Sequence, residues 1–202
     1  MEINWNMDKI AEGYGDTRDE FVRNMNCNSM SAQAERTVAR LVDGRTVPGQ
    51  EAYDVIAGND HWSSRIEVRN MKTRLSFAPS TATGKGRFFE ESTFYDKLEK
   101  VDSYVVLDMN PIYDGGKPLA YEIPAETVKG LYELEVLGSA ASCAFSKRKV
   151  YRAASWRRLL RFEELFPYST FKFEPNHAKK DYPTAKELRD DAIERIEEGL
   201  AC

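Results

Sequence analysis

The stretch AYDVIAGNDHWSSRIEVR, residues 52–69, decides the fold that we expect for this chain. It holds two runs of apolar and β-branched residues, separated by the turn-forming residues Gly-Asn-Asp at 58–60. This arrangement predicts a β-hairpin with strands over residues 52–57 and 64–71. The elements on either side of the hairpin then define the fold class.

Three charged side chains of the hairpin form a candidate site. Asp54 is expected on the first strand, and Glu67 and Arg69 lie two residues apart on the second. Because side chains alternate between the faces of a strand, Glu67 and Arg69 should point the same way, and strand pairing brings Asp54 toward them. Two carboxylates beside a cation are a candidate Mg²⁺ site for phosphodiester chemistry. The simpler alternative is an exposed Glu67–Arg69 pair on a solvated face, which would add little to stability.

Helical spacing of apolar residues predicts two helices ahead of the hairpin, over residues 16–27 and 31–43. Ser31 is expected as the N-cap of the second helix and Gly44 as its end. Beyond the hairpin we expect a mobile polar loop at 73–92, a short helix at 94–100, a buried strand at 101–109, turns at 110–118, a strand at 120–123, a helix from 124, a strand at 149–155, a helix at 156–166 and a C-terminal helix at 184–199 that begins at Thr184. This order predicts a mixed α/β protein with a central mixed sheet.

Length and composition are those of an ordinary globular protein. The chain has 202 residues, of which 42% are hydrophobic and 31% charged, and no internal repeat or long linker divides it, so a single domain over 1–202 is expected. No apolar run approaches a membrane span, and the first residues lack the apolar core of a secretory signal. The three cysteines have no metal-like spacing, which favours free thiols and a cytoplasmic location.

Positive charge is concentrated in one segment, although the formal net charge is −4. Between residues 136 and 162 there is no acidic residue but there are seven lysines and arginines, whereas the tail from residue 184 is acidic. A local positive field of this kind suits a polyanion. The alternative is a solvated helix face that pairs with the acidic C-terminal helix. The residues that we assign to nucleic-acid contact are Lys85, Arg87, Lys147, Arg148, Lys149, Arg152, Trp156 and Arg157.

With these elements in place, residues 31–125 resemble the restriction-endonuclease-like fold of the PD-(D/E)xK nuclease superfamily. The resemblance rests on Tyr53-Asp54, then twelve intervening residues, then Glu67-Val68-Arg69. The stretch GRTVPGQEAYDVIAG, residues 44–58, is also similar to the approach to the metal site of small type II restriction enzymes. The expected helix and apolar strand after the hairpin agree with that family's order of elements. The resemblance implies a restriction endonuclease-like central mixed β-sheet flanked by helices.

The resemblance also implies site residues and a function. Asp54 and Glu67, with the Val68 carbonyl, would hold Mg²⁺, Arg69 would hold the scissile phosphate, and Glu35 of the preceding helix would orient water or a second ion. The implied activity is Mg²⁺-dependent cleavage of double-stranded DNA by a homodimer. We expect that Asp54→Ala or Glu67→Ala abolishes cleavage and leaves the fold intact.

One position departs from the family's pattern. Arg69 stands where the family has Lys, and an arginine keeps its proton, so it stabilises a phosphate but does not act as a base. A bulge in the strand, or a cation from elsewhere such as Lys85, could compensate. Two alternatives therefore stay open: a catalytically degenerate nucleic-acid-binding protein of the same fold, and an unrelated α/β interaction protein.

Overall fold

The computed structural model describes most of the chain up to residue 144 and short pieces beyond it. The described residues are 2–25, 30–48, 51–59, 62–71, 74–79, 81–83, 86–137, 141–144, 151–152, 159–160, 184, 186–187, 189–190 and 194. For residues 59, 62, 74, 81–83, 86–88, 142–144, 151–152 and 159–160 only the backbone is described.

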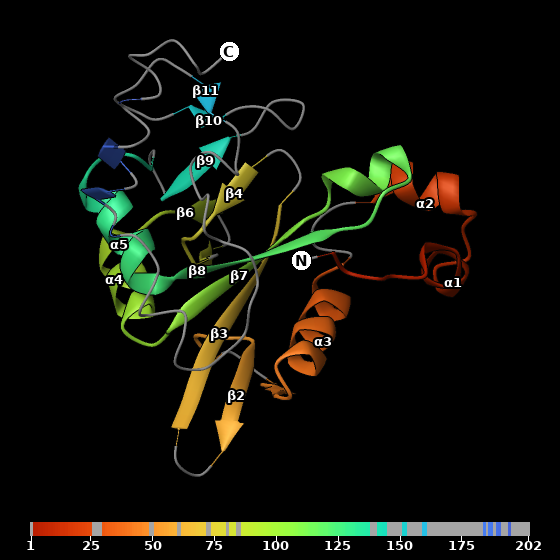
Figure 1. The fold of residues 1–202 in the computed structure, drawn as a ribbon, viewed down its shortest axis with the longest axis horizontal. Coiled ribbons are helices and arrows are strands. Elements are labelled where there is room, and N and C mark those ends of the chain that lie inside the picture. Colours follow the sequence, from red (N-terminus) through yellow and green to blue (C-terminus); the bar gives the residue numbers. More distant parts are fainter. Residues whose placement is uncertain are drawn as a thin grey trace.

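A five-stranded sheet in the order β1-β2-β3-β7-β8 forms the centre of the fold (Figure 1). Its strands are β1 (Arg45–Thr46), β2 (Val55–Asn59), β3 (Trp62–Met71), β7 (Ser103–Asp108) and β8 (Leu119–Pro124). β3 and β7 are parallel, and the other neighbouring pairs are antiparallel. The predicted α/β class, the β2–β3 hairpin and the two later strands are therefore confirmed.

Five α-helices are described: α1 (Met7–Gly13), α2 (Arg18–Asn24), α3 (Ser31–Leu41), α4 (Glu91–Leu98) and α5 (Ala125–Glu133). The helix expected over 16–27 is present as α2, whose N-cap Thr17 forms a reciprocal capping box with Glu20. The seven-residue α1 was not predicted. It begins at Asn6, whose side chain accepts a hydrogen bond from the Lys9 amide, and its short apolar pattern gave little helical signal.

The two ends of α3 differ in how well the sequence predicted them. Ser31 is the first helical residue and not the N-cap, which is the buried Met30. Gly44 does end the helix, because its amide donates to the Ala39 carbonyl at 2.8 Å. A Cβ at Gly44 would lie 2.5 Å from the Ile56 carbonyl oxygen, so only glycine lets the chain pass this close to β2.

Two separate hydrophobic clusters cover the two faces of the sheet. On one face, Val38 of α3 packs with Ile66 and Val105. On the other face, Phe94 of α4 packs with Tyr104 and Val106, together with residues of α5. Figure 1 shows α3 on one side of the sheet and α4 with α5 on the other. β7 is buried on both faces along its whole length, which explains its continuous apolar sequence.

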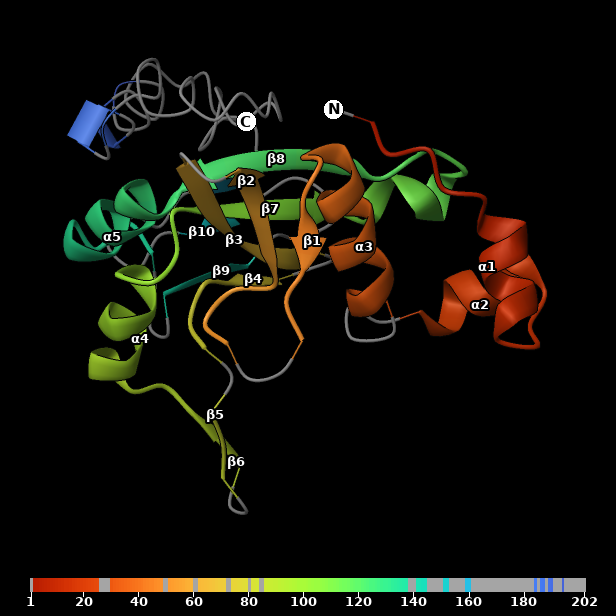
Figure 2. The same cartoon turned by 90° about the horizontal axis from the view of Figure 1, so that it is seen from below.

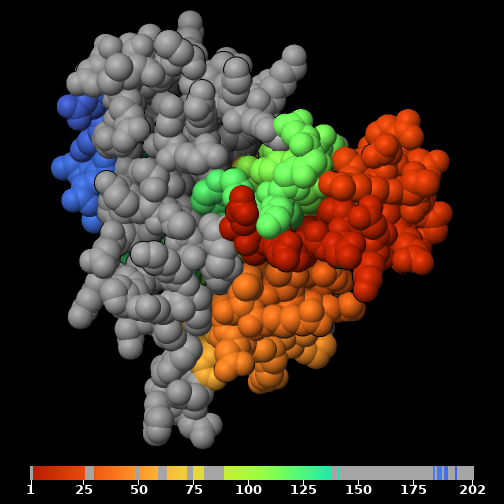
Figure 3. Space-filling model, turned by 45° about the vertical axis from the view of Figure 1, so that its right-hand side comes forward, coloured from red at the N-terminus to blue at the C-terminus, as the bar shows by residue number. Residues whose placement is uncertain are grey.

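The N-terminal segment is tied to the far edge of the sheet. The Ile3 amide donates to the Pro118 carbonyl at 2.7 Å, and Glu2 forms an isolated bridge with Leu119 of β8. Figure 3 shows this segment (red) against the green surface that includes the 3-10 helix η1 (Asn110–Asp114). The turns expected at 110–118 thus contain a short helix.

Two predictions for the chain outside the central sheet were wrong. The region 73–92 is not a simple loop but contains β4 (Arg74–Ser76), β5 (Thr81–Thr83) and β6 (Gly86–Phe88). β5 and β6 form a hairpin that extends away from the body of the molecule (Figure 2). The helix expected at 156–166 is contradicted by strand β11 (Leu159–Leu160), which pairs with β10 (Tyr151–Arg152).

Strand β4 pairs with β9 (Ser142–Ala144), almost seventy residues later, at the register Leu75↔Cys143. A local sequence window does not show such partners, and strand formation depends on them.

At the C-terminus, the Thr184 amide donates to Glu187 Oε2 at 2.7 Å and the Glu187 amide donates to Thr184 Oγ1 at 3.3 Å. This capping box supports Thr184 as the N-cap. Among the described helices, none has the length and apolar character needed to cross a membrane.

Candidate functional site

Asp54 lies immediately before β2 and not on the strand as predicted. Its amide donates to the Ile66 carbonyl at 3.0 Å, and its carbonyl accepts from the Val47 amide at 2.8 Å. Its side-chain Oδ2 accepts a hydrogen bond from the Val68 amide at 2.8 Å. Backbone and side-chain contacts therefore fix Asp54 beside the middle of β3, one residue away from Glu67.

Glu67 is a buried carboxylate, with only 4% of the residue exposed. Its Oε1 accepts from Lys97 Nζ at 2.6 Å and from an Arg69 terminal nitrogen at 2.9 Å. The prediction that Glu67 and Arg69 share a face is confirmed. The alternative of an exposed ion pair on a solvated hairpin is wrong, because Glu67 is buried and also bonds Lys97 of α4.

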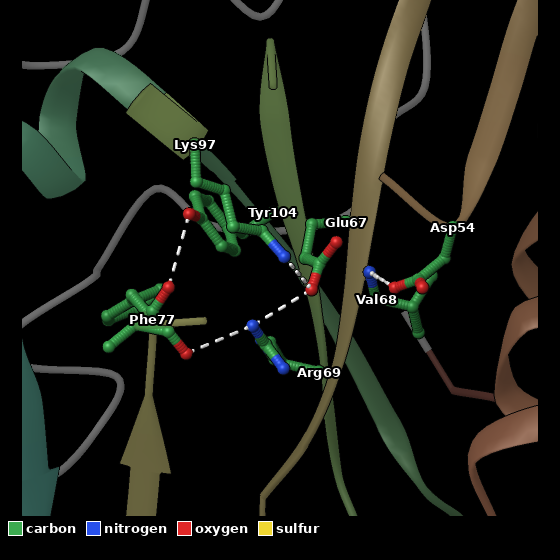
Figure 4. Close-up of polar contacts among 8 residues, drawn as sticks. Asp54, Glu67, Val68, Arg69, Phe77, Lys97 and Tyr104 are labelled. Atoms are coloured by element: carbon green, nitrogen blue, oxygen red, sulfur yellow. Dashed lines mark hydrogen bonds and ion pairs between the residues drawn. The ribbon is translucent and has the colours of Figure 1, made fainter. Parts of the chain in front are cut away.

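Arg69 joins the site to the segment that follows β4. One of its terminal nitrogens donates to the Ala78 carbonyl at 3.3 Å, while its buried Nε has no hydrogen-bond partner among the described residues. Tyr104 lies nearby on β7, where its hydroxyl donates to the Phe77 carbonyl at 3.3 Å. The site thus lies between β3, β7, α4 and the residues that directly follow β4 (Figure 4).

Lys97 is the site residue that our sequence reasoning missed. It comes from α4, thirty residues after Glu67, and its side chain is only 12% exposed. One signal was available: Lys97 lies three residues after Phe94 and directly before Leu98, both of which are buried on the inner face of α4. Residues three and four apart share a helix face, so Lys97 belonged near the sheet.

Burial and the charges of neighbouring carboxylates raise the pKa values of two acidic residues in the site. Burial raises the pKa of Glu67, Arg69 opposes this shift, and Asp54 adds to it. Partial burial also raises the pKa of Glu35 on α3, and the charges of Asp54 and Glu67 raise it further. The three predicted acidic residues therefore lie within electrostatic reach of one another, as a cation site requires.

The two oxygens most suited to a cation are Asp54 Oδ1 and Glu67 Oε2. Within the described residues neither oxygen has a hydrogen-bond partner, because the Val68 amide uses Asp54 Oδ2 and the two cations use Glu67 Oε1. In the view of Figure 4 the two carboxylates lie on either side of the β3 ribbon. No group of three or more described His, Cys, Asp or Glu residues forms a ready metal cluster. A Mg²⁺ ion held by one or two carboxylates and several waters still fits this donor set.

The residues predicted to contact nucleic acid are mostly outside the described part of the chain. Lys85, Lys147, Arg148, Lys149, Trp156 and Arg157 lie outside it. Arg87 is placed on β6 and Arg152 on β10 by their backbones alone. The described part of the candidate site therefore consists of Asp54, Glu67, Arg69 and Glu35, together with Lys97.

Comparisons with models of known protein families, with curated proteins and with solved structures gave no match to this chain.

Partial burial of the Glu35 carboxylate, together with the nearby charges of Asp54 and Glu67, predicts that Glu35→Gln stabilises the metal-free protein at pH 8. Because the folded-state pKa of Glu35 is raised, its favourable contribution is complete below the unfolded pKa of about 4.3 and is lost as the pH rises through the folded pKa. The gain from Glu35→Gln should therefore appear at pH 8 and disappear near pH 3.5. Thermal unfolding in EDTA at both pH values measures this difference.

Glu12→Gln is the matched control, since Glu12 is exposed on α1. It should change the melting temperature little at either pH. Equal melting temperatures of wild type and Glu35→Gln at pH 8 would contradict this effect of burial and charge.

Proposed function

We propose that this protein is a Mg²⁺-dependent endonuclease that hydrolyses phosphodiester bonds of double-stranded DNA, with a site of the PD-(D/E)xK type. The observation that carries the proposal is the polar cluster around β3. Three carboxylates (Glu35, Asp54 and Glu67) and two cations (Arg69 and Lys97) gather on a largely apolar framework. Burying charge costs stability even where the charges are paired, so we infer that this cluster has a chemical role.

The order of elements supports the same proposal. A helix carrying Glu35 is followed by a hairpin carrying Asp54 and Glu67, then by α4 and the apolar strand β7. This is the order that the resemblance to the nuclease superfamily implies. Its mixed sheet flanked by helices is the restriction endonuclease-like arrangement that we propose for the chain.

In this proposal each residue has a separate task. Asp54, Glu67 and the Val68 carbonyl would hold Mg²⁺, which when bound supplies an activated water and stabilises charge on the phosphate. Arg69 would bind the scissile phosphate with its terminal nitrogens, and its permanent charge suits that task. Glu35, at the half-buried edge of the cluster, would orient water. Water oriented by Glu35 would attack the phosphorus, the bond from phosphorus to the leaving oxygen would break, and the leaving oxygen would take up a proton from solvent.

Cutting both strands of a duplex requires two active sites, so we further propose a homodimer with two-fold symmetry. The basic segment of residues 136–162 would supply additional phosphate contacts. If it does, the affinity for DNA should fall steeply with added salt, and salt-independent binding would argue against this assignment.

Incubation of the purified protein with plasmid and phage DNA, in Mg²⁺ or EDTA, tests the activity. Discrete fragments that depend on Mg²⁺ are the result expected for a sequence-specific endonuclease, and a smear would indicate a nonspecific one. DNA intact after long incubation with Mg²⁺ would contradict the proposed activity.

A cytoplasmic location remains the expectation from the spacing of the cysteines, which favours free thiols.

One observation favours a second candidate function, a nucleic-acid-binding protein of the same fold without catalytic activity. Glu67 is already neutralised by two cations within 3 Å, as in a structural ion-pair cluster. A gel shift with DNA but no cleavage in Mg²⁺ would favour this candidate. Absence of any interaction with DNA would instead favour an α/β protein with an unrelated partner.

A further inference from the structure

We propose that Lys97 and Arg69 together form a phosphate subsite, and that phosphate and metal binding are coupled because both depend on Glu67. In the free protein the two cations occupy Glu67 Oε1 at 2.6 Å and 2.9 Å. A phosphate group of DNA offers them another anionic partner, and Glu67 then becomes available to the metal. This inference rests on the proposed function, but it adds a residue, Lys97, to the site. It also states that the binding of the phosphate and the binding of the metal depend on each other.

The charge arrangement in the free protein supports the coupling. Burial and the nearby Arg69 lower the pKa of Lys97, and only part of this shift is offset by Glu67 and Asp54. Two cations thus share one carboxylate oxygen in a partly dehydrated site. An additional anion would relieve their repulsion, and a phosphate oxygen is the strong acceptor that both lysine and arginine bind.

Exposure and hydrogen bonding are also consistent with a ligand. The side chains of Arg69 and Lys97 are 23% and 12% exposed, whereas the Glu67 side chain is only 5% exposed. The two cations are therefore more exposed than the carboxylate that they share. The buried Arg69 Nε has no acceptor in the part of the chain that the structure describes, so its guanidinium has unused capacity for hydrogen bonds.

The same arrangement predicts how a metal ion behaves without DNA. A Mg²⁺ ion at Glu67 would stand close to two positive charges, so like-charge repulsion weakens its binding. When a phosphate binds to Lys97 and Arg69, this repulsion is reduced, and metal affinity rises. By thermodynamic linkage, the metal must increase the affinity for the phosphate by the same factor.

Lys97→Met separates this coupling from a purely structural role, because the two ligands respond with opposite signs. At pH 8 without DNA, the variant should bind Mg²⁺ at least about ten-fold more tightly than wild type, because one repelling charge is gone. In EDTA it should bind a labelled DNA duplex more weakly, with a salt slope lower by about one. Isothermal titration measures the first effect, and fluorescence anisotropy at several salt concentrations measures the second.

Two control variants make the result specific. Lys129→Met makes the same change at a half-exposed lysine on α5 and should leave Mg²⁺ affinity unchanged. Lys97→Arg keeps the positive charge, so its Mg²⁺ affinity should be close to that of the wild type. Circular dichroism and thermal unfolding will show whether Lys97→Met folds. If it does not, Lys97→Arg serves as the test variant. Tighter Mg²⁺ binding by Lys97→Arg than by the wild type would then overturn the coupling.

Cleavage of plasmid by the wild type, measured in parallel, separates the inference from the proposed function. If the wild type cuts DNA but Lys97→Met binds Mg²⁺ no more tightly, the coupling is overturned and the nuclease proposal stands. If both affinities change as expected but no cutting occurs, the coupling stands and the proposed activity fails. A wild-type protein that binds neither Mg²⁺ nor DNA would overturn both.

Discussion

Asp54→Asn should lower the rate of Mg²⁺-dependent DNA cleavage by at least about 100-fold, which is the effect expected for loss of one preorganised electrostatic group. The substitution removes the negative charge that we assign to the metal. Its amide oxygen can still accept the hydrogen bond from the Val68 amide, now 2.8 Å from Asp54 Oδ2. The fold should therefore survive while the activity is lost, and initial cleavage rates with thermal unfolding measure both.

A buried carboxylate elsewhere in the sheet provides the matched control. Glu122 on β8 is 7% exposed, and it pairs in register with Val105, which belongs to the hydrophobic cluster on the α3 face. Glu122→Gln makes the equivalent change outside the site and should retain cleavage. Full activity of Asp54→Asn, or equal loss in both variants, would remove Asp54 from the proposed metal site.

Glu67→Ala should lower the free energy of unfolding by about 3 kcal/mol or more, because it leaves two poorly solvated cations without their shared partner. The sequence alone suggested that this change would leave the fold intact. The structure alters that expectation, since Lys97 and Arg69 both point to Glu67 Oε1. Urea denaturation of wild type and variant, analysed as a two-state transition, measures the loss.

Double substitution identifies the origin of this destabilisation. Adding Lys97→Met to Glu67→Ala removes one unpaired buried charge, so the double variant should be more stable than Glu67→Ala alone. Glu67→Gln keeps an acceptor oxygen for Lys97 and should lose less stability than Glu67→Ala. If all three variants unfold at the same urea concentration as the wild type, the buried ion cluster does not contribute to the fold as we argue.

Much of the central sheet could be predicted because its signals are local. The hairpin follows from two β-prone runs around a turn, and β7 from a continuous apolar run that is typical of a strand buried on both faces. The alternation of side chains correctly placed Glu67 and Arg69 on one face. The helix expected at 156–166 failed, because a strand depends on a partner elsewhere in the chain, and β11 pairs with β10.

The candidate site was predicted only in part, for a related reason. Asp54, Glu67 and Arg69 belong to one hairpin, so strand geometry alone relates them. Glu35 was placed with them through the family resemblance, and its pKa is raised by partial burial and, further, by the charges of Asp54 and Glu67. Lys97 escaped because no rule of local spacing connects residues on different elements thirty positions apart.

The sequence by itself thus determined the α/β class, the hairpin and the pairing of an acidic and a basic side chain on β3, since these depend on residue alternation and turn chemistry. Only the tertiary structure decided that Glu67 is buried and that Lys97 shares its Oε1 with Arg69. The physical reason is that both results depend on contacts between elements far apart in the chain, because Lys97 of α4 reaches Glu67 of β3. Burial of the carboxylate in turn makes a neighbouring cation necessary.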